Sequence, residues 1–323
     1  MGAKGGRAPT EVTLHSTRRV LLTGGAGFIG SHLAASLLAD GWAVDVVDDL
    51  STGSRVNVPD GAEFLELDLG RRGAVEALPA RDYAAILHLA GQSSGEKSFD
   101  SPVRDFDANA RSTLLLANWG VQRGVPAFIH ASSMGVYGQP DELPVGEHID
   151  PRPISWYGGS KLAAERVLQL AALEGMRTVS LRMFSIYGPG QDLSEMRQGM
   201  ASIFLAMLLR GEPVDVHGAL DRVRDFVYVD DCVSAWRMAL ERQVSGAFNV
   251  GTGVGTTVGD LIAQLIDLAG LPADHPVTAT GTTPGDQTAM IADPGRAVLE
   301  LGWEARTKLR DGLEAMVRWA RDD

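Results

Sequence analysis

The sequence has few of the features that mark disulfide-bonded, secreted or membrane-spanning proteins. It contains a single cysteine, Cys232, which excludes an internal disulfide framework and is typical of a reducing compartment. No apolar run approaches the roughly 18 residues needed to cross a bilayer. The first 18 residues lack the apolar core of a signal peptide. We therefore expect a cytoplasmic protein that does not bind membranes.

Basic residues are also scarce. The chain has 29 Lys and Arg residues against 41 Asp and Glu residues, a formal net charge of −12, and its arginines are not gathered into one segment. This balance gives no general attraction to nucleic acids, so an anionic substrate must be held by a few placed cations. At 323 residues, 45% of them hydrophobic, and without an internal repeat, the chain is long enough for two globular lobes.

The stretch 19–33 predicts a strand, a glycine turn and a helix. A short apolar run ends in glycines, and apolar residues then recur at helical spacing over 28–41. Gly24, Gly27 and Gly30 lie three residues apart. This spacing allows a tight turn, the close approach of a pyrophosphate to the backbone, and close packing of the helix on the strand. The unpaired N–H groups at the start of the helix would then face the phosphates.

A second predicted strand, over 43–47, ends in Asp48 and Asp49, about 20 residues after the glycine turn. A carboxylate at this place accepts hydrogen bonds from the ribose hydroxyls of an adenosine, and it repels a 2′-phosphate. The pair therefore predicts NAD rather than NADP as the cofactor. Arg55 is the one nearby residue that favours NADP.

Strands and helices alternate beyond this unit. Further strands are predicted over 62–66, 83–89, 127–131 and 178–182, and helices over 102–123 and 156–174. Such alternation is typical of a parallel sheet whose ligand site lies at the carboxyl ends of its strands. The predicted fold class is α/β, a Rossmann-like doubly wound parallel sheet with a smaller C-terminal α/β substrate lobe.

Beyond residue 190 the alternation weakens. Only helices are predicted there, near 200–210, 229–241, 258–269 and 313–321. We expect a flexible tail over 1–17 and an NAD-binding Rossmann domain over 18–183, to which the segment 213–252 returns. The substrate-binding lobe is expected to comprise 184–212 and 253–323.

Tyr157 and Lys161 lie four residues apart at the start of a predicted helix, so their side chains share one face. A neighbouring ammonium stabilises a phenolate and lowers the pKa of the tyrosine, which lets the pair accept a proton. Only four basic residues are lysines, so a lysine here indicates a need for a compact ammonium. Ser133, at the end of a predicted strand, adds a hydroxyl that both donates and accepts. The alternatives are an ordinary helix surface and a turn-forming serine.

Eight segments, in this order, resemble the extended short-chain dehydrogenase/reductases, and within them most of all the nucleotide-sugar 4-epimerases. They are Thr23-Gly-Gly-Ala-Gly-Phe-Ile-Gly30, Asp48-Asp-Leu-Ser-Thr-Gly53, His88-Leu-Ala-Gly91, Asn109, Ser132-Ser-Met-Gly-Val-Tyr-Gly138, Tyr157-Gly-Gly-Ser-Lys161, Arg182-Met-Phe-Ser-Ile-Tyr-Gly-Pro-Gly190 and Arg224-Asp-Phe-Val-Tyr-Val-Asp-Asp231. The resemblance extends from about residue 19 to the C-terminus. This ordered set is far more specific than a glycine triplet alone.

The resemblance implies an NAD site beside a nucleotide-sugar site. It makes Tyr157 the base, Ser133 a bridge to the sugar hydroxyl, and Lys161 a contact of the nicotinamide ribose. Arg224 matches an arginine that binds the substrate diphosphate. The implied NAD-binding residues are Gly24, Gly27, Phe28, Ile29, Gly30, Asp48, Asp49, Ser51, Thr52, Gly53, Asp68, Leu69, Leu89, Ala90, Gly91, Asn109, Tyr157 and Lys161. The implied substrate-binding residues are Ser93, Ser133, Ser185, His217, Arg224, Asp286 and Met290. No metal ligand is expected.

Several positions depart from the family pattern. The Met-Gly pair at 134–135 stands where dehydratases and decarboxylases of the family carry acidic residues, which argues for oxidation and re-reduction at one carbon. Ser185 and Thr283 replace an asparagine and an arginine that commonly contact the nucleotide. His217 replaces an aromatic residue that stacks on the base. Met290 falls where side-chain bulk decides whether an N-acetyl sugar is accepted.

These observations predict NAD-dependent epimerisation at C4 of a nucleotide-diphosphate sugar through a transient 4-keto sugar. The substrate would be of the UDP-glucose, UDP-N-acetylglucosamine or UDP-glucuronate type. The alternatives are a decarboxylase, dehydratase or reductase of the same family, or a non-catalytic NAD-sensing protein. The resemblance also implies a homodimer that packs through the helices containing Asn109 and Tyr157.

Overall fold

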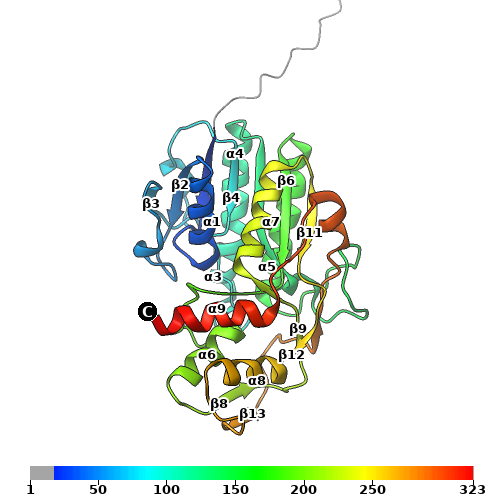
Figure 1. The fold of residues 1–323 in the computed structure, drawn as a ribbon. Coiled ribbons are helices and arrows are strands. Elements are labelled where there is room, and N and C mark those ends of the chain that lie inside the picture. Colours follow the sequence, from blue (N-terminus) through cyan, green and yellow to red (C-terminus); the bar gives the residue numbers. More distant parts are fainter. Residues whose placement is uncertain (1–17, 323) are drawn as a thin grey trace, which may run out of the picture.

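The computed structural model describes residues 18–322, so the flexible tail predicted over 1–17 lies outside the described residues. The centre of the fold is a seven-stranded sheet in the order β11-β6-β5-β4-β1-β2-β3 (Figure 1). All neighbours pair in parallel, which confirms the predicted fold class. The strands are β1 (Arg19–Thr23), β2 (Ala43–Asp48), β3 (Glu63–Glu66), β4 (Ala85–His88), β5 (Ala127–Ser133), β6 (Arg177–Met183) and β11 (Gly246–Val250).

The strand order reverses at β1. β2 and β3 extend the sheet on one side of β1, and β4, β5 and β6 extend it on the other. The carboxyl ends of β1 and β4 therefore lie side by side at a topological switch point, where open α/β sheets form a binding crevice. Thr23, the last residue of β1, is in register with Val47 of β2 and with His88 of β4.

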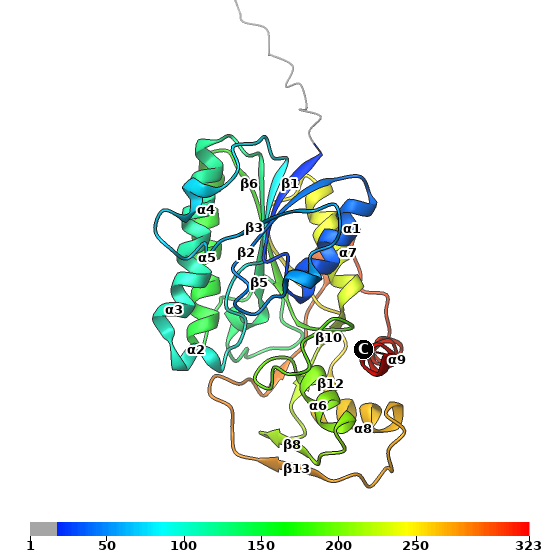
Figure 2. The same cartoon turned by 90° about the vertical axis from the view of Figure 1, so that its left-hand side faces the viewer.

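Helices cover both faces of the sheet, as Figure 2 shows. One face carries α1 (Phe28–Ala39) and α7 (Val229–Glu241); the other carries α3 (Pro102–Phe106), α4 (Ser112–Gln122) and α5 (Trp156–Leu173). Because successive strand residues point to opposite faces, Leu22 packs in the core with Leu33 of α1 and Trp236 of α7, whereas Leu21 packs with Leu116 of α4 and Leu168 of α5.

The single helix predicted over 102–123 is interrupted. A π-helical segment, η3 (Asp107–Arg111), joins α3 to α4, and the short helix α2 (Lys97–Asp100) precedes them. Such one-turn π segments inside α-helices are frequent at functional sites. Asn109, which the sequence assigned to the cofactor site, lies in this segment.

A smaller lobe lies below the sheet in Figure 1 and contains α6 (Met200–Leu209), α8 (Val258–Leu268) and α9 (Leu309–Asp322). Its own core includes Leu205, Leu261 and Met316, one from each helix. Its strands are short. β8 (Val214–His217) pairs with β13 (Val277–Thr280), β9 (Val223–Arg224) with β12 (Thr256–Thr257) and β14 (Ala289–Met290), and β10 (Phe226–Tyr228) with β7 (Ser185–Tyr187).

The segment 213–252 is distributed over both parts. α7 packs on the large sheet and β11 forms its edge, whereas β8 pairs with β13 in the lobe. The division into domains at residues 183, 213 and 252 remains a proposal. None of the helices in the described part of the chain is both long enough and apolar enough to span a membrane.

Candidate active site

Three glycines shape the turn between β1 and α1. Gly24 has a φ of +73°, and a Cβ there would lie 2.5 Å from the backbone nitrogen of Ala90, so only glycine is accommodated. A Cβ on Gly30 would overlap the carbonyl oxygen of Gly24, because α1 packs closely on the turn. A Cβ on Gly27 would meet only that oxygen, at 3.3 Å. Gly27 is the N-cap and no described side chain caps the helix, so the first N–H groups can receive a phosphate.

Asp48, the last residue of β2, braces this turn. Its carboxylate accepts hydrogen bonds from the backbone N–H groups of Ala26 and Leu50, each at 2.9 Å. Burial raises the pKa of Asp48 above its ordinary value, and the two hydrogen bonds oppose this rise. Asp49 is exposed. One carboxylate therefore shapes the turn, and the next one faces solvent.

The residues after Asp49 pass over the glycine turn. A Cβ on Gly53 would lie 2.9 Å from the backbone of Ala26, whereas 51–52 are exposed. The guanidinium of Arg55, the residue that favours NADP, lies 4.5 Å from the centre of the Phe64 ring. A glycine turn, an uncapped helix start and a carboxylate at the end of the second strand are the groups that bind a pyrophosphate and a ribose. These residues therefore fit a dinucleotide such as NAD.

The remaining predicted cofactor residues lie at the ends of neighbouring strands or beside them. Residues 68–69 follow β3, and 89–91 follow β4. Asn109 is fully buried, and its Oδ1 has no hydrogen-bond partner among the described residues. A Cβ on Gly91 would overlap this oxygen and would lie 3.3 Å from the Nζ of Lys161. The fold thus brings Gly91, Asn109 and Lys161 to one point.

Tyr157, Lys161 and Ser133 meet at the carboxyl end of β5. α5 begins directly after Ser155, whose side chain caps the helix by accepting a backbone hydrogen bond. Tyr157 and Lys161 therefore lie one turn apart, and the Lys161 ammonium is 5.8 Å from the centre of the Tyr157 ring. Ser133 ends β5 within hydrogen-bonding reach of the Tyr157 phenol.

Burial has the largest effect on the pKa values of Tyr157 and Lys161. It raises the pKa of Tyr157 to about 12, although the hydrogen bond with Ser133 lowers it. It lowers the pKa of Lys161 to about 8, and the nearby carboxylate of Asp105 opposes this. The prediction that the pKa of Tyr157 lies below its ordinary value is wrong, because burial has the largest effect and the nearby carboxylate of Asp105 adds to it. At neutral pH the phenol keeps its proton and the ammonium is charged.

A cavity of about 550 Å³ opens beside Tyr157. This volume lies within the range of ligand sites, about 300–1,000 Å³. Of the residues predicted from the sequence, it is lined by Phe28, Ile29, Ser93, Ser133, Tyr157, Ser185, His217, Arg224 and Asp286. Residues expected to act on the substrate and residues expected to bind it therefore face the same space.

Two buried arginines face this cavity from β9 and the position before it. Arg222 and Arg224 flank Val223, and both form ion pairs with Asp286. Arg224 is 1% exposed and also donates a hydrogen bond to the carbonyl of Gln287 at 2.6 Å. Because two guanidinium groups share one carboxylate, the cluster of Arg222, Arg224 and Asp286 has a net positive charge, although the protein as a whole is acidic. Such a cluster can hold a diphosphate.

Of the other predicted substrate residues, Ser93 and His217 line the cavity and Met290 does not. Ser93 accepts a hydrogen bond from the side-chain amide of Gln198 at 2.7 Å, and His217 is exposed, 3.7 Å from Asp215. Met290 is fully buried in the main hydrophobic core and does not line the cavity. The structure does not bring Met290 to the substrate site, because β14 pairs with β9 and directs this side chain into the core.

Sequence reasoning missed two charged residues of the site, Arg222 and Asp105. The alternation Arg222-Val-Arg224 was an available signal, since residues two apart in a strand share a face. Asp105 precedes Asn109 by one helical turn, but nothing in the sequence indicates that its carboxylate is 1% exposed. Within residues 18–322, no group of three or more His, Cys, Asp and Glu side chains could hold a metal ion.

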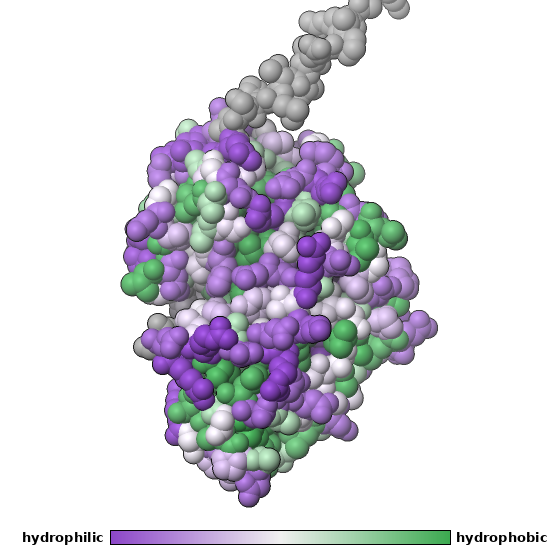
Figure 3. All heavy atoms as spheres, viewed as in Figure 1, coloured by the Kyte–Doolittle hydropathy of each residue, from purple (hydrophilic) through white to green (hydrophobic). Residues whose placement is uncertain are grey.

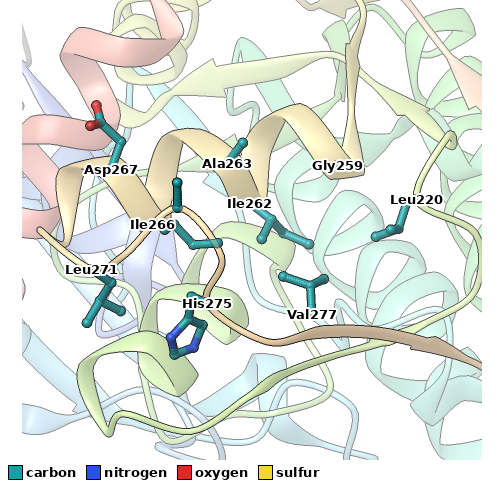
Figure 4. Close-up of a pocket in the computed structure, with 10 residues that line it drawn as sticks. Leu220, Gly259, Ile262, Ala263, Ile266, Asp267, Leu271, His275 and Val277 are labelled. Carbon is teal, nitrogen blue, oxygen red and sulfur yellow. The ribbon is translucent and has the colours of Figure 1, made fainter.

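A second cavity, of about 290 Å³, lies on the lobe and shares no lining residue with the first. Figure 4 shows apolar side chains of α8 facing Val277 across it, and Figure 3 shows apolar side chains gathered on this lobe. Its polar groups are already paired: Asp267 with Arg310 at 2.6 Å, and His275 with the carbonyl of Glu212 at 2.9 Å. We assign it no role in the reaction.

Fold and site together define a class of protein. A glycine turn at the switch point of a parallel sheet, next to a half-buried tyrosine and a buried lysine one helical turn apart, is the arrangement of a dinucleotide-dependent enzyme that moves a proton at a hydroxyl group. The family model described as the NAD dependent epimerase/dehydratase family matches residues 20–251. The chain belongs to this family.

Known proteins resemble the chain over nearly its whole length. The UDP-glucose 4-epimerase of Mycolicibacterium smegmatis is 35% identical over 315 residues, which cover 94% of this chain and 99% of that protein. The structure of the Thermotoga maritima UDP-glucose 4-epimerase with UDP-glucose has 37% identity and a TM-score of 0.90, and the match covers 94% of this chain and 99% of that one. The Thermus thermophilus UDP-glucose 4-epimerase in complex with NAD has 35% identity and a TM-score of 0.86, with the same coverage of both chains.

Proposed function

We propose that this protein is an NAD-dependent epimerase that inverts C4 of a nucleotide-diphosphate sugar. The observation that carries the proposal is one cavity lined both by groups that transfer a proton, Tyr157 and Ser133, and by groups that hold a diphosphate, Arg222 and Arg224. The glycine turn beside it fits NAD. The three relatives described above, all UDP-glucose 4-epimerases, support this reaction and this cofactor.

In this proposal Tyr157 reacts as the phenolate: it takes the proton from the C4 hydroxyl and later returns it to the oxygen of the 4-keto sugar. Ser133 donates a hydrogen bond to the phenolate oxygen, and the ammonium of Lys161, one turn away, stabilises its charge. NAD held at the glycine turn of Gly24, Gly27 and Gly30 would supply a reversible hydride acceptor for C4, and its positive charge would favour the phenolate of Tyr157. Arg222 and Arg224 hold the diphosphate while the 4-keto sugar rotates to present its other face.

The surroundings of Tyr157 argue against dehydration and decarboxylation. A Cβ on Gly135 would lie 3.5 Å from the Tyr157 ring, so this position is adjacent to the base and carries no acid. The described carboxylates that line the cavity are engaged elsewhere: Glu96 with Arg197, Asp286 with Arg222 and Arg224, and Asp215 with Thr278 and Thr280. No described carboxylate that lines the cavity is therefore free to expel water or to remove a second proton.

Product analysis tests the proposal. Purified protein is incubated separately with UDP-glucose, UDP-N-acetylglucosamine and UDP-glucuronate, and the products are identified by NMR. We expect at least one of them to be converted to its C4 epimer, with unchanged mass and no net oxidation of NADH. Loss of carbon dioxide would show a decarboxylase, loss of water a dehydratase, and net NADH oxidation a reductase. Bound NAD without turnover of any of the three would favour an NAD sensor.

We also propose that two copies associate through α3, α4 and α5 as a homodimer in the cytoplasm. These helices cover one face of the sheet, as Figure 2 shows, and they expose large apolar side chains. Val103 is 74%, Leu170 63% and Leu173 83% exposed. Large apolar side chains exposed on neighbouring helices are typical of protein–protein interfaces. The buried free thiol of Cys232 supports a reducing compartment.

A further inference from the structure

Asp105 is a buried carboxylate that the reaction above does not use. It lies in α3 and is 1% exposed. Its Oδ1 accepts hydrogen bonds from Gln92 Nε2 at 2.7 Å and from Asn109 Nδ2 at 3.3 Å, and its Oδ2 accepts one from Ser160 Oγ at 2.6 Å. All three donors are neutral. A carboxylate buried in this way is costly unless a positive charge lies nearby.

Lys161 is the complementary case, a buried ammonium that is 3% exposed. The titratable groups that face it are His88 from β4, His130 from β5, Tyr157 from its own helix and Asp105 from α3. Burial lowers the pKa of His88 to about 3 and that of His130 well below its ordinary value, so both are neutral at physiological pH. Asp105 is therefore the negative charge that faces Lys161 within residues 18–322.

Hydrogen bonds join Asp105 to the turn of α5 that carries Lys161. Ser160, which donates to Asp105, directly precedes Lys161 in α5. Asn109 donates both to Asp105 and, at 3.1 Å, to Ser160 Oγ. A Cβ on Gly91 would meet both Asn109 Oδ1 and Lys161 Nζ, so the free amide oxygen and the ammonium face the same point. The network therefore fixes η3 and α3 against the turn of α5 that carries Lys161.

We propose that Asp105 is a positioning residue for the Tyr157–Lys161 pair: its carboxylate balances the buried ammonium and fixes α5 at the turn that carries it. This keeps Lys161 charged at neutral pH, and with it the cation that stabilises the Tyr157 phenolate. The direction of the pKa of Lys161 agrees, since Asp105 raises it against the effect of burial. The inference rests on the proposed function only in the role given to Lys161.

The scarcity of lysine makes a direct test possible. Protein labelled with ¹³C at the lysine Cε contains only four labelled side chains, and Lys97→Arg and Lys308→Arg help to assign them. NMR of the purified full chain then follows the titration of Lys161. We expect a midpoint near the pKa of about 8 in the wild type. In Asp105→Asn we expect it to fall by about one pH unit or more, because an ammonium without its counter-charge releases its proton at lower pH.

Glu165→Gln is the matched control. Glu165 lies on the same helix, is 4% exposed and is paired with Arg182 at 2.7 Å, so its loss removes another buried carboxylate. We expect it to lower stability and to leave the Lys161 midpoint in place. Asp105→Glu, which keeps the charge, should keep the midpoint closer to the wild-type value than Asp105→Asn does. If Asp105→Asn does not fold, Asp105→Ser takes its place.

Activity gives a second readout. The alkaline limb of the pH profile of kcat should move to lower pH in Asp105→Asn, by about the same amount as the Lys161 midpoint, and should stay in place in Glu165→Gln. Equal Lys161 midpoints in wild type and Asp105→Asn would overturn the proposal, as would an equal shift in Glu165→Gln. A wild-type midpoint below 7 would also overturn it, whether or not the variants fold. The NMR titration needs no substrate, so it separates this proposal from a failure of the proposed epimerisation.

Discussion

The sheet domain and the lobe support the site in different ways. Ser133 ends a strand of 7 residues, and Tyr157 and Lys161 lie on a helix of 18 residues, so backbone hydrogen bonds fix their positions. Arg224 lies on a strand of 2 residues and is held mainly by its side chain, through Asp286 and the carbonyl of Gln287. The proton-transfer groups are thus placed by long regular elements, and the anion-binding groups by an ion-pair cluster.

Because of this difference, we expect substitutions in the sheet domain to change kcat and substitutions in the lobe to change KM for the nucleotide sugar. A group that acts only on the reacting hydroxyl changes kcat when it is removed, whereas a group that holds the nucleotide throughout the cycle changes KM. The two regions are therefore expected to respond differently to substitution.

The largest effect is expected from Tyr157→Phe, which keeps the ring and removes the base. We expect kcat to fall by about 10²-fold or more, with KM within about threefold of the wild type, since general-base catalysis contributes at least that much. Steady-state kinetics with the substrate identified by NMR measures both constants. Tyr228→Phe removes a phenol that does not line the cavity and should leave kcat unchanged. Turnover of Tyr157→Phe near the wild-type rate would reject the assignment.

On the lobe side, Arg224→Gln is expected to raise KM for the nucleotide sugar by about 10- to 100-fold, since hydrogen bonds to charged groups contribute about 1.5–3 kcal/mol. The effect on kcat should be small. Arg222→Gln should raise KM less, because Arg222 is more exposed than Arg224. Arg237→Gln, which removes a surface ion pair with Asp40, is the control and should change neither constant. A fall in kcat at constant KM would contradict the division of roles.

The proposed NAD-binding turn can be disrupted by a substitution that leaves the proton-transfer residues unchanged. In Gly30→Ala the added methyl overlaps the Gly24 carbonyl, so α1 must move away from the turn. We expect a loss of stability of about 1–3 kcal/mol, as for other overpacked sites, together with weaker retention of NAD. Thermal unfolding and the nucleotide released on denaturation measure the two effects. Gly159→Ala, in a helix with no neighbouring atom within 4 Å, should keep or raise stability.

The smallest effect on turnover is expected from Leu173→Glu. Leu173 is 83% exposed on α5, far along the helix from Tyr157, so the charge should disrupt the proposed dimer and leave the site intact. Light scattering on the eluting protein should show a dimer for the wild type and a monomer for the variant. A wild-type protein that elutes as a monomer at micromolar concentration would contradict the proposed interface.

The two regions also differ in how far they could be predicted. In the sheet domain the predicted strands occur with shifts of at most two residues at their ends, and the helix over 229–241 has the predicted bounds. Two features of this domain were not predicted: η3 interrupts the helix expected over 102–123, and β11 forms the edge of the sheet. In the lobe, none of the short strands was predicted. A strand of 2 residues has no periodicity, and β9 pairs with β12 and β14, whose residues lie more than 30 positions away. Only long-range pairing creates such elements.

Features that depend on local geometry follow from the order of the residues alone. Three glycines three residues apart specify a phosphate-binding turn, and residues four apart on a helix share a face, so the positions of Gly24–Gly30, Tyr157 and Lys161 follow from spacing alone. Tertiary structure decided what depends on burial. It placed Met290 in the core, enclosed Asp105 beside Lys161, paired two arginines with Asp286, and raised rather than lowered the pKa of Tyr157. Desolvation and ion pairing depend on all the atoms around a group, most of which come from distant parts of the chain.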